Sequence, residues 1–214
     1  MIFQSRADQV FWQVLISAAL ALGLLGTASW AALRPEFTRV GYAPEQPVPF
    51  SHELHAGKLG MSCVYCHSNV ERSPHAAVPD TQTCMNCHQT IKSNSPLLSL
   101  VRESFDKGTP VEWKRVHRLP DYAFFNHAQH VNRGVGCVSC HGQINEMPVV
   151  VHEKPLSMGW CLNCHRHPEP NLRPPLEATN MAWKRPLEDP HLFGEKMNQK
   201  LNVNPPQSCQ GCHR

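Results

Sequence analysis

The segment "PFSHELHAGKLGMSCVYCH", residues 49–67, contains three histidines and two cysteines. Its last five residues, Cys63-Val-Tyr-Cys66-His67, form a Cys-x-x-Cys-His motif. This motif is the attachment site of a c-type haem, in which both thiols bond to the porphyrin and the adjacent histidine ligates the iron. A single copy is also compatible with half of a zinc site or with a redox disulfide, so the remaining cysteines decide between these interpretations.

All ten cysteines of the chain occur in five copies of this motif. The pairs are Cys63 and Cys66, Cys84 and Cys87, Cys137 and Cys140, Cys161 and Cys164, and Cys209 and Cys212, and the histidines that follow them are His67, His88, His141, His165 and His213. Zinc ribbons do not require a histidine after each cysteine pair, and disulfide frameworks do not space their thiols so uniformly. The sequence therefore predicts five covalently bound c-type haems, each with a motif histidine as the proximal iron ligand.

Composition limits the fold class and the partners. The 214 residues include 19 prolines, are 41% hydrophobic and carry a formal charge of +3. Five ferric haems with ionised propionates change the net charge to about −2, so the basic apoprotein does not indicate nucleic-acid binding. With one haem for roughly every forty residues, we expect a mainly α multihaem cytochrome c domain with extensive loops and a haem-dominated core.

Residues 10–33, "VFWQVLISAALALGLLGTASWAAL", are uncharged and as a helix would be about 36 Å long, enough to cross a membrane. We expect one transmembrane helix there, preceded by a short cytoplasmic N-terminus at residues 1–9. The alternative is a cleaved signal peptide with a small-residue site at Ser29-Trp-Ala31, but the apolar run exceeds the usual signal-peptide core.

An internal duplication organises the remainder of the chain. Phe50-Ser-His52-Glu-Leu-His55 precedes the first haem motif as Phe125-Asn-His127-Ala-Gln-His130 precedes the third, and corresponding residues lie 75, 74 and 77 positions apart. We therefore expect a linker at residues 34–49, dihaem modules at 50–124 and 125–200, and a fifth haem motif at 201–214. Helical patterning is restricted to short pieces such as residues 96–105.

The histidine pairs that precede the motifs supply candidate sixth ligands. Two histidines three residues apart on a helical turn have Cβ atoms about 5–6 Å apart, so they cannot bind opposite faces of one haem. If His52 and His55 are both ligands, they serve different irons, and the same holds for His127 and His130.

Nine histidines lie outside the five motifs. The distal candidates are, in order of preference, His52, His55, His127 and His130, followed by His117 and His75. These are six candidates for five irons. Met147 and Met158 are lower-ranked alternatives, and thioether ligation would raise the potential of that haem. We interpret His152, His167 and His191 as structural.

Three functions fit a membrane-anchored multihaem chain. If every iron is six-coordinate, no open site remains and the protein conducts electrons. Multihaem reductases need an open haem site and commonly replace a motif histidine with lysine, which none of the five motifs does. Tetrahaem quinol dehydrogenases that stand alone and feed a periplasmic reductase also have one span, but the fifth motif and the duplicated units depart from their pattern.

The segments "FSHELHAGKLGMSCVYCHSN", "TCMNCH", "RVHRLPDYAFFNHAQHV", "CHGQINEMP", "PLSMGWCLNCHR" and "SCQGCHR" give the chain a specific resemblance. From Phe50 to Arg214 it resembles the pentahaem cytochrome c subunit of bacterial alternative complex III, a quinol:electron acceptor oxidoreductase. The resemblance implies that multi-span membrane subunits oxidise quinol. Electrons would then pass through an iron-sulfur subunit and this chain, which is not catalytic alone, to a monohaem cytochrome c, a copper protein or a terminal oxidase.

The resemblance to c-type cytochromes also implies a location. Haem is attached to such proteins outside the cytoplasm. We therefore expect the haem domain on the periplasmic side of the bacterial inner membrane.

The first prediction concerns the coordination of the irons. With two protein ligands on every iron, the visible and EPR spectra of the purified protein should contain only low-spin haem, unchanged by cyanide or carbon monoxide. A substantial high-spin signal that binds either ligand would contradict the electron-conducting function.

Overall fold

The computed structural model describes residues 5–186 and 189–213 and divides the chain into two compact units, Met1–Val40 and Gly41–Arg214. The cytoplasmic segment expected at residues 1–9 falls partly on residues 1–4, and the fifth haem segment ends at Arg214. Residues 1–4 and 214 lie outside the described residues. The two units are considered separately below.

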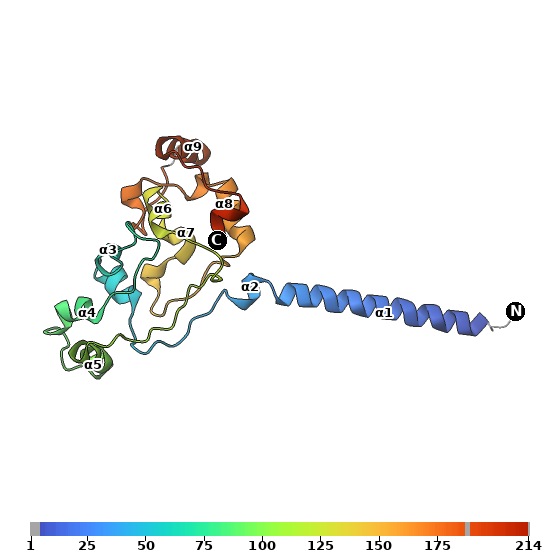
Figure 1. Ribbon diagram of the computed structural model, residues 1–214, viewed down its shortest axis with the longest axis horizontal. Coiled ribbons are helices and arrows are strands. Elements are labelled where there is room, and N and C mark those ends of the chain that lie inside the picture. The colour runs from blue at the N-terminus through green and yellow to red at the C-terminus, as the bar shows by residue number, and fades with distance from the viewer. Residues whose placement is uncertain (1–4, 187–188, 214) are drawn as a thin grey trace. The chain divides into compact units, whose positions relative to one another are not determined.

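The first unit consists of α1 (Ser5–Ala32) and α2 (Pro35–Thr38) (Figure 1). Helix α1 begins five residues before the expected span of 10–33 and ends one residue before its end. An 18-residue window within Arg6–Ala32 has a mean hydropathy of 1.9, and the apolar side chains of the helix are exposed. A helix that is apolar all round requires a nonpolar environment. By length and composition, α1 is suited to cross a membrane.

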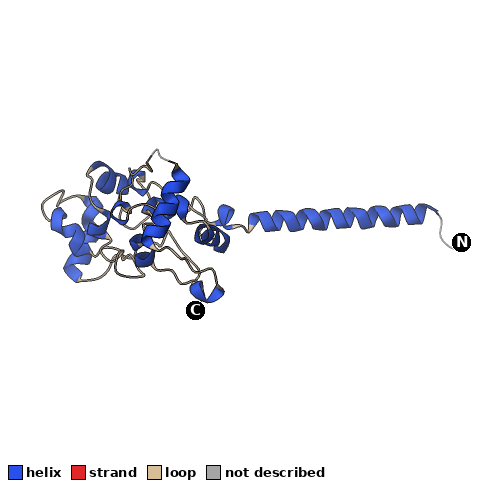
Figure 2. Ribbon diagram, turned by 90° about the horizontal axis from the view of Figure 1, so that it is seen from above, coloured by secondary structure: helices blue, strands red, loops and turns tan. Residues whose placement is uncertain are grey.

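The second unit is built from short helices joined by long loops (Figure 2). Within residues 5–186 and 189–213 there is no strand, and isolated bridges join Ala123 to His213 and Val135 to Leu172. The helices are η1 (Glu53–Lys58), α3 (Cys63–Cys66), α4 (Thr81–His88), η2 (Pro96–Leu98), α5 (Ser99–Lys107), α6 (His127–Asn132), α7 (Cys137–His141), η3 (Ile144–Glu146), α8 (Met158–Arg166), η4 (Glu169–Asn171), η5 (Pro175–Glu177), α9 (Pro190–Leu201) and α10 (Cys209–Cys212). The expected fold class, mainly helical with extensive loops, is confirmed, and η2 with α5 forms the helix expected at 96–105.

Side-chain caps determine where several of these helices begin. Asp80, Asn126 and Ser157 accept hydrogen bonds from the amides of the third residue of α4, α6 and α8, respectively, so each satisfies a backbone donor that the helix leaves unpaired. Helix α5 ends at Gly108, whose φ of 64° is a left-handed conformation that glycine adopts without steric cost. These caps place the second and fourth haem motifs within α4 and α8.

The apolar interior of the second unit is sparse. One cluster of buried side chains consists of Val48, Met85 and Val101, and a second cluster consists of Val70, Val131 and Ala178. Interiors of globular proteins are normally close-packed around one contiguous core. Two small clusters do not provide such a core. Sparse packing of this kind is the arrangement required if prosthetic groups occupy most of the interior.

Two leucines test how much this sparse core contributes to stability. Leu172 is 0% exposed and Leu176 is 95% exposed, although they are separated by only a few residues. Leu172→Ala should lower the free energy of unfolding by about 2–5 kcal/mol because it leaves a cavity, whereas Leu176→Ala should change it by less than about 0.5 kcal/mol. Chemical denaturation of the solubilised, haem-loaded protein measures both values, and equal losses would contradict the assigned packing.

Candidate metal centres

One phenylalanine orients each of the two histidine pairs. The Phe50 ring lies edge-on to His52, at 4.9 Å between centroids and 88°, and stacks on His55 at 4.4 Å and 25°. Because one ring is packed in both ways, the two imidazoles face different directions. The second copy repeats this geometry for Phe125, at 4.7 Å and 90° to His127 and at 4.4 Å and 30° to His130.

Each of these four histidines faces the histidine of a haem motif. The ring centroids are 6.5 Å apart for His52 and His67, 6.2 Å for His55 and His88, 6.5 Å for His127 and His141, and 6.1 Å for His130 and His165. The two histidines of each pair therefore face imidazoles from two different haem motifs.

The spacing of the facing rings fits an iron between them. Two metal–nitrogen bonds of about 2 Å and two ring radii of about 1 Å separate opposed imidazole centroids by about 6 Å. The four observed distances, 6.1–6.5 Å, agree with this requirement. These eight residues are therefore suited to hold four haem irons, each with two axial imidazoles.

Backbone carbonyls accept hydrogen bonds from most of these imidazoles. An Nδ1–H that donates to a carbonyl leaves Nε2 unprotonated and free to bind a metal. The Nδ1–oxygen distances are 2.9 Å for His55 to Ser51, 2.7 Å for His67 to Ala77, 2.9 Å for His88 to Ile91, 2.8 Å for His127 to Pro74, 2.7 Å for His130 to Asn126, 2.7 Å for His165 to Pro206 and 3.2 Å for His213 to Tyr122.

Burial keeps the central imidazoles neutral. It lowers the pKa of His141 to about 3 and that of His52 to about 4, and neighbouring imidazoles contribute in the same direction. Burial also lowers the pKa of His127 and His130. Since a metal binds the deprotonated imidazole nitrogen, these side chains are in their ligating form at neutral pH.

All ten motif cysteines are free thiols, and these sulfur atoms stand for the thioethers of the haem-loaded protein. Burial raises the pKa of the Cys140 thiol to about 12, with further contributions from nearby thiols. It also raises the pKa of the thiols of Cys63, Cys66, Cys84, Cys137, Cys161 and Cys164. Without haem, these seven thiols would therefore be protonated and unreactive in the folded chain.

Two motif cysteines depart from the expected enclosure of the attachment sites. Cys87 and Cys209 are exposed, whereas the other eight are partly buried. Cys87 follows Met85 by two residues in α4, so it lies about 200° around the helix from the side chain that packs into the first apolar cluster. The polypeptide therefore leaves Cys87 uncovered, and a haem bonded to it would be open to solvent at that edge. Its role in haem attachment, like that of Cys209, stays a prediction from the motif.

The fifth motif histidine, His213, has a different ring neighbour. It contacts Tyr122 at 5.6 Å, and among the described residues no imidazole faces it at the spacing found in the other four sites. The two remaining distal candidates are elsewhere. His75 is exposed, and His117 packs edge-on against His141 at 4.4 Å, which is too close for an iron between them.

The lower-ranked candidates and the structural histidines differ in their surroundings. Met158 is 68% exposed at the start of α8, and Met147 is half-buried in the contact of η1 with η3. His167 and His191 are exposed. His152 is fully buried, donates from Nδ1 to the Val116 carbonyl at 3.2 Å and lies 5.3 Å from the His117 ring. The sixth ligand of the fifth haem therefore remains a prediction.

A family model described as "Cytochrome c7 and related cytochrome c" matches residues 48–104 and 123–214. The chain belongs to this multihaem cytochrome c family. The family binds c-type haem covalently, as the motifs indicate, and the number of five haems remains a prediction from the sequence.

This multihaem cytochrome is also similar to a protein named menaquinone reductase, multihaem cytochrome c subunit, from Nitratidesulfovibrio vulgaris. The two are 38% identical over 98 residues, which are 45% of this chain and 46% of the relative. The chain thus aligns with about half the length of that protein.

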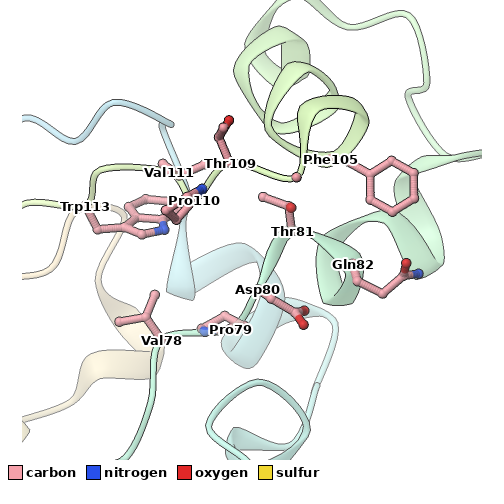
Figure 3. A pocket seen from close by; sticks show the side chains of 11 residues that line it. Val78, Pro79, Asp80, Thr81, Gln82, Phe105, Thr109, Pro110, Val111 and Trp113 are labelled. Atoms are coloured by element: carbon pink, nitrogen blue, oxygen red, sulfur yellow. The ribbon is translucent and has the colours of Figure 1, made fainter.

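A cavity of about 500 Å³ opens beside the helix that carries the second haem motif. Trp113 and Val78 lie on one side and Phe105 on the other, with Asp80 and Thr81 between them (Figure 3). No cysteine or histidine lines this cavity. Asp80 accepts hydrogen bonds from the Thr83 amide at 2.9 Å and from its hydroxyl at 2.8 Å, which lower the pKa of the carboxyl. Its role here is to cap α4.

The assignment of His52 and His55 to different irons is testable by substitution. His52→Met should alter the EPR signal and reduction potential of the first haem only, and His55→Met those of the second haem only, because each replaces one nitrogen ligand with a thioether. His191→Met is the matched control, since this exposed side chain faces no motif histidine, and it should leave all signals unchanged. If His52→Met and His55→Met alter the same signal, the assignment is wrong.

Proposed function

We propose that this chain is the electron-transfer subunit of a membrane quinol oxidoreductase, with five covalently bound haems, four of which have both axial positions taken by histidine. The observation that carries the proposal is the set of four facing imidazole pairs. Because a protein ligand is available on each face of these four irons, no axial position is left for a substrate. The cofactor supplies one-electron chemistry, and the chain holds and insulates it.

The order of the motif cysteines supports conduction along a continuous path. Asn86 of the second motif donates to the Tyr65 hydroxyl of the first at 3.1 Å, so these two motifs lie side by side. Cys63 of the first motif and the Cys137 amide of the third donate to the adjacent carbonyls of Thr179 and Ala178. The Cys164 thiol of the fourth motif adds to the effect of burial in raising the pKa of Cys140 in the third, and His165 of the fourth motif donates to the Pro206 carbonyl just before the fifth. The order of neighbouring motifs is therefore second, first, third, fourth and fifth.

The histidine pairs add a second type of connection. His52 and His55, one turn apart, face the first and second motifs, and His127 and His130 face the third and fourth. A single turn thus positions two neighbouring irons in each module. The second and fifth haems are then the ends of the path, where a donor and an acceptor would dock.

The partners follow from the similarity to known complexes. The relative in N. vulgaris is named as a subunit of a menaquinone reductase, and the sequence resembles the pentahaem subunit of alternative complex III. One helix among the described residues is long and apolar enough to cross a membrane. We therefore assign quinol oxidation to multi-span partner subunits, with electrons entering through an iron-sulfur subunit and leaving to a monohaem cytochrome c, a copper protein or an oxidase on the periplasmic side.

The name of the relative favours one alternative, in which the complex reduces quinone. The same haem path would then carry electrons in the opposite direction, from a periplasmic donor towards the membrane subunits. Axial coordination is the same for both directions, so the direction is decided by the partners and by the potentials.

Isolation of the complex tests the proposed function. A tagged copy of the chain, extracted from native membranes in mild detergent, should retain an iron-sulfur protein and multi-span membrane subunits that mass spectrometry identifies. Membranes without the tagged copy are the control. Recovery of the chain alone, or with only a periplasmic reductase, would instead make it a stand-alone quinol dehydrogenase. Anaerobic addition of quinol to the complex should reduce its haems, whereas reduction by periplasmic donors alone would support the quinone-reducing direction.

A further inference from the structure

The five motif histidines differ in the partner of Nδ1. His67, His88, His165 and His213 each donate a hydrogen bond to a backbone carbonyl. In His141, Nδ1 is buried and has no hydrogen-bond partner. The nearest rings to His141 include the edge-on ring of His117 at 4.4 Å.

The distal histidines show the same difference. His55, His127 and His130 donate from Nδ1 to the carbonyls of Ser51, Pro74 and Asn126, whereas Nδ1 of His52 is buried without a partner. The edge-on phenylalanine does not account for this difference, because Phe50 and Phe125 contact His52 and His127 in the same way.

The lack of an acceptor for Nδ1 of His52 follows from the order of the duplicated modules. His127 of the second module uses the Pro74 carbonyl, which lies 53 residues earlier in the first module. His52 belongs to the first module, so no preceding module supplies a corresponding carbonyl.

The lack of an acceptor for Nδ1 of His141 follows from a difference in backbone conformation between the two modules. In the first module Ala77, with a φ of 63°, presents its carbonyl to Nδ1 of His67. In the second module the segment after His141 instead exchanges backbone hydrogen bonds with residues 41 and 42, at 2.8 Å from the Gly41 amide to the His152 carbonyl and 2.9 Å from the His152 amide to the Tyr42 carbonyl. It therefore presents no carbonyl to His141.

The angles between facing rings divide the four sites in the same way. The ring planes are nearly parallel for His52 with His67, at 3°, and for His127 with His141, at 14°. They are strongly inclined for His55 with His88, at 66°, and for His130 with His165, at 39°. The first and third sites thus share both features, and the second and fourth sites share neither.

We infer that His52 and His141 give the first and third haem sites higher reduction potentials than the second and fourth sites. An imidazole whose Nδ1–H donates to a carbonyl is a more basic ligand and stabilises ferric over ferrous iron. One axial ligand of the first site and one of the third lack this effect, whereas both ligands of the second and fourth sites have it. Each iron gains one electron, from ferric to ferrous, and Nδ1 retains its proton in both states.

The inferred potentials have a consequence for the path. In the order second, first, third, fourth and fifth, the two haems with the higher potentials are neighbours and lie inside the electron path, away from its ends. Electrons delivered by the quinol-oxidising partners would then reside on the first and third haems between transfers. This inference rests on the proposed bis-histidine coordination.

An EPR-monitored potentiometric titration of the full-length protein in its purified complex tests the inference. Four single variants assign the signals, with His52→Met for the first haem, His55→Met for the second, His127→Met for the third and His130→Met for the fourth. His191→Met is the control that should change none of them. By ligand-field theory, parallel imidazole planes give rhombic low-spin signals and inclined planes give more anisotropic ones. We expect the rhombic signals to belong to the first and third haems and to disappear on reduction at higher potentials than those of the second and fourth.

The outcomes separate the inference from the proposed function. If the four variants fail to alter four different signals, the ligand assignment is wrong and the inference fails with it. If they do alter four signals but the first or third haem is reduced at or below the potential of the second or fourth, only the inference about the hydrogen bonds is overturned. Should a variant fail to assemble, the wild-type titration still decides, because the fifth haem accounts for only one signal. If every rhombic signal titrates below the anisotropic ones, the inference is contradicted.

Discussion

Two imidazoles separated by one helical turn lie on the same side of the backbone and cannot oppose each other across a metal. Each must therefore find its opposite ligand elsewhere in the chain, and this constraint organises the second unit. His52 and His55 face His67 and His88, so the π-helix η1 is held between two haem motifs. Regular secondary structure contributes little to the arrangement of this unit, because its described residues contain short helices without strands. In the proposed coordination, the positions of the axial ligands take the place that sheet pairing or helix packing has in other folds.

The two modules are joined at the place where this constraint is repeated. Helix α6, which carries His127 and His130, begins against residues 73 and 74 of the first module, whose carbonyls accept from the amides of Ala128 at 3.2 Å and His127 at 3.1 Å. Asn132 donates to the Glu71 carbonyl at 3.0 Å from the other end of the helix. One short helix thus carries the proposed ligands of its own module and is positioned by residues of the preceding one. This junction lies between the first and third haem motifs, and in the proposed function it joins the two halves of the electron path.

The sequence was most informative where chemistry depends on residue type and spacing. The motif cysteines and histidines, the apolar first helix, the mainly helical class and the histidine pairs were all evident from residue patterns. The acceptors of Nδ1 were not, because they are backbone carbonyls whose direction depends on turns such as the left-handed Ala77. The exposure of Cys87 was not evident either, since the motif fixes the spacing of its cysteines and not the side of the helix that the chain covers.

The histidines outside the motifs are harder to separate by sequence. The sequence assigns His152 and His167 the same structural role, and no residue pattern distinguishes the complete burial of His152 from the exposure of His167. The distal ligand of the fifth haem also could not be chosen, since a single appended motif has no second copy with which to compare spacing.

The sparse core has a consequence for how the protein is made. Thiols such as Cys140 are buried and held in the protonated form in the folded chain, whereas thioether formation requires each sulfur to reach a vinyl group of the porphyrin. The chain must therefore receive its prosthetic groups before it compacts. Until then it has only two small apolar clusters with which to collapse, and it is exposed to proteases. The supply of haem, more than the rate of translation, would then set how much of this protein accumulates.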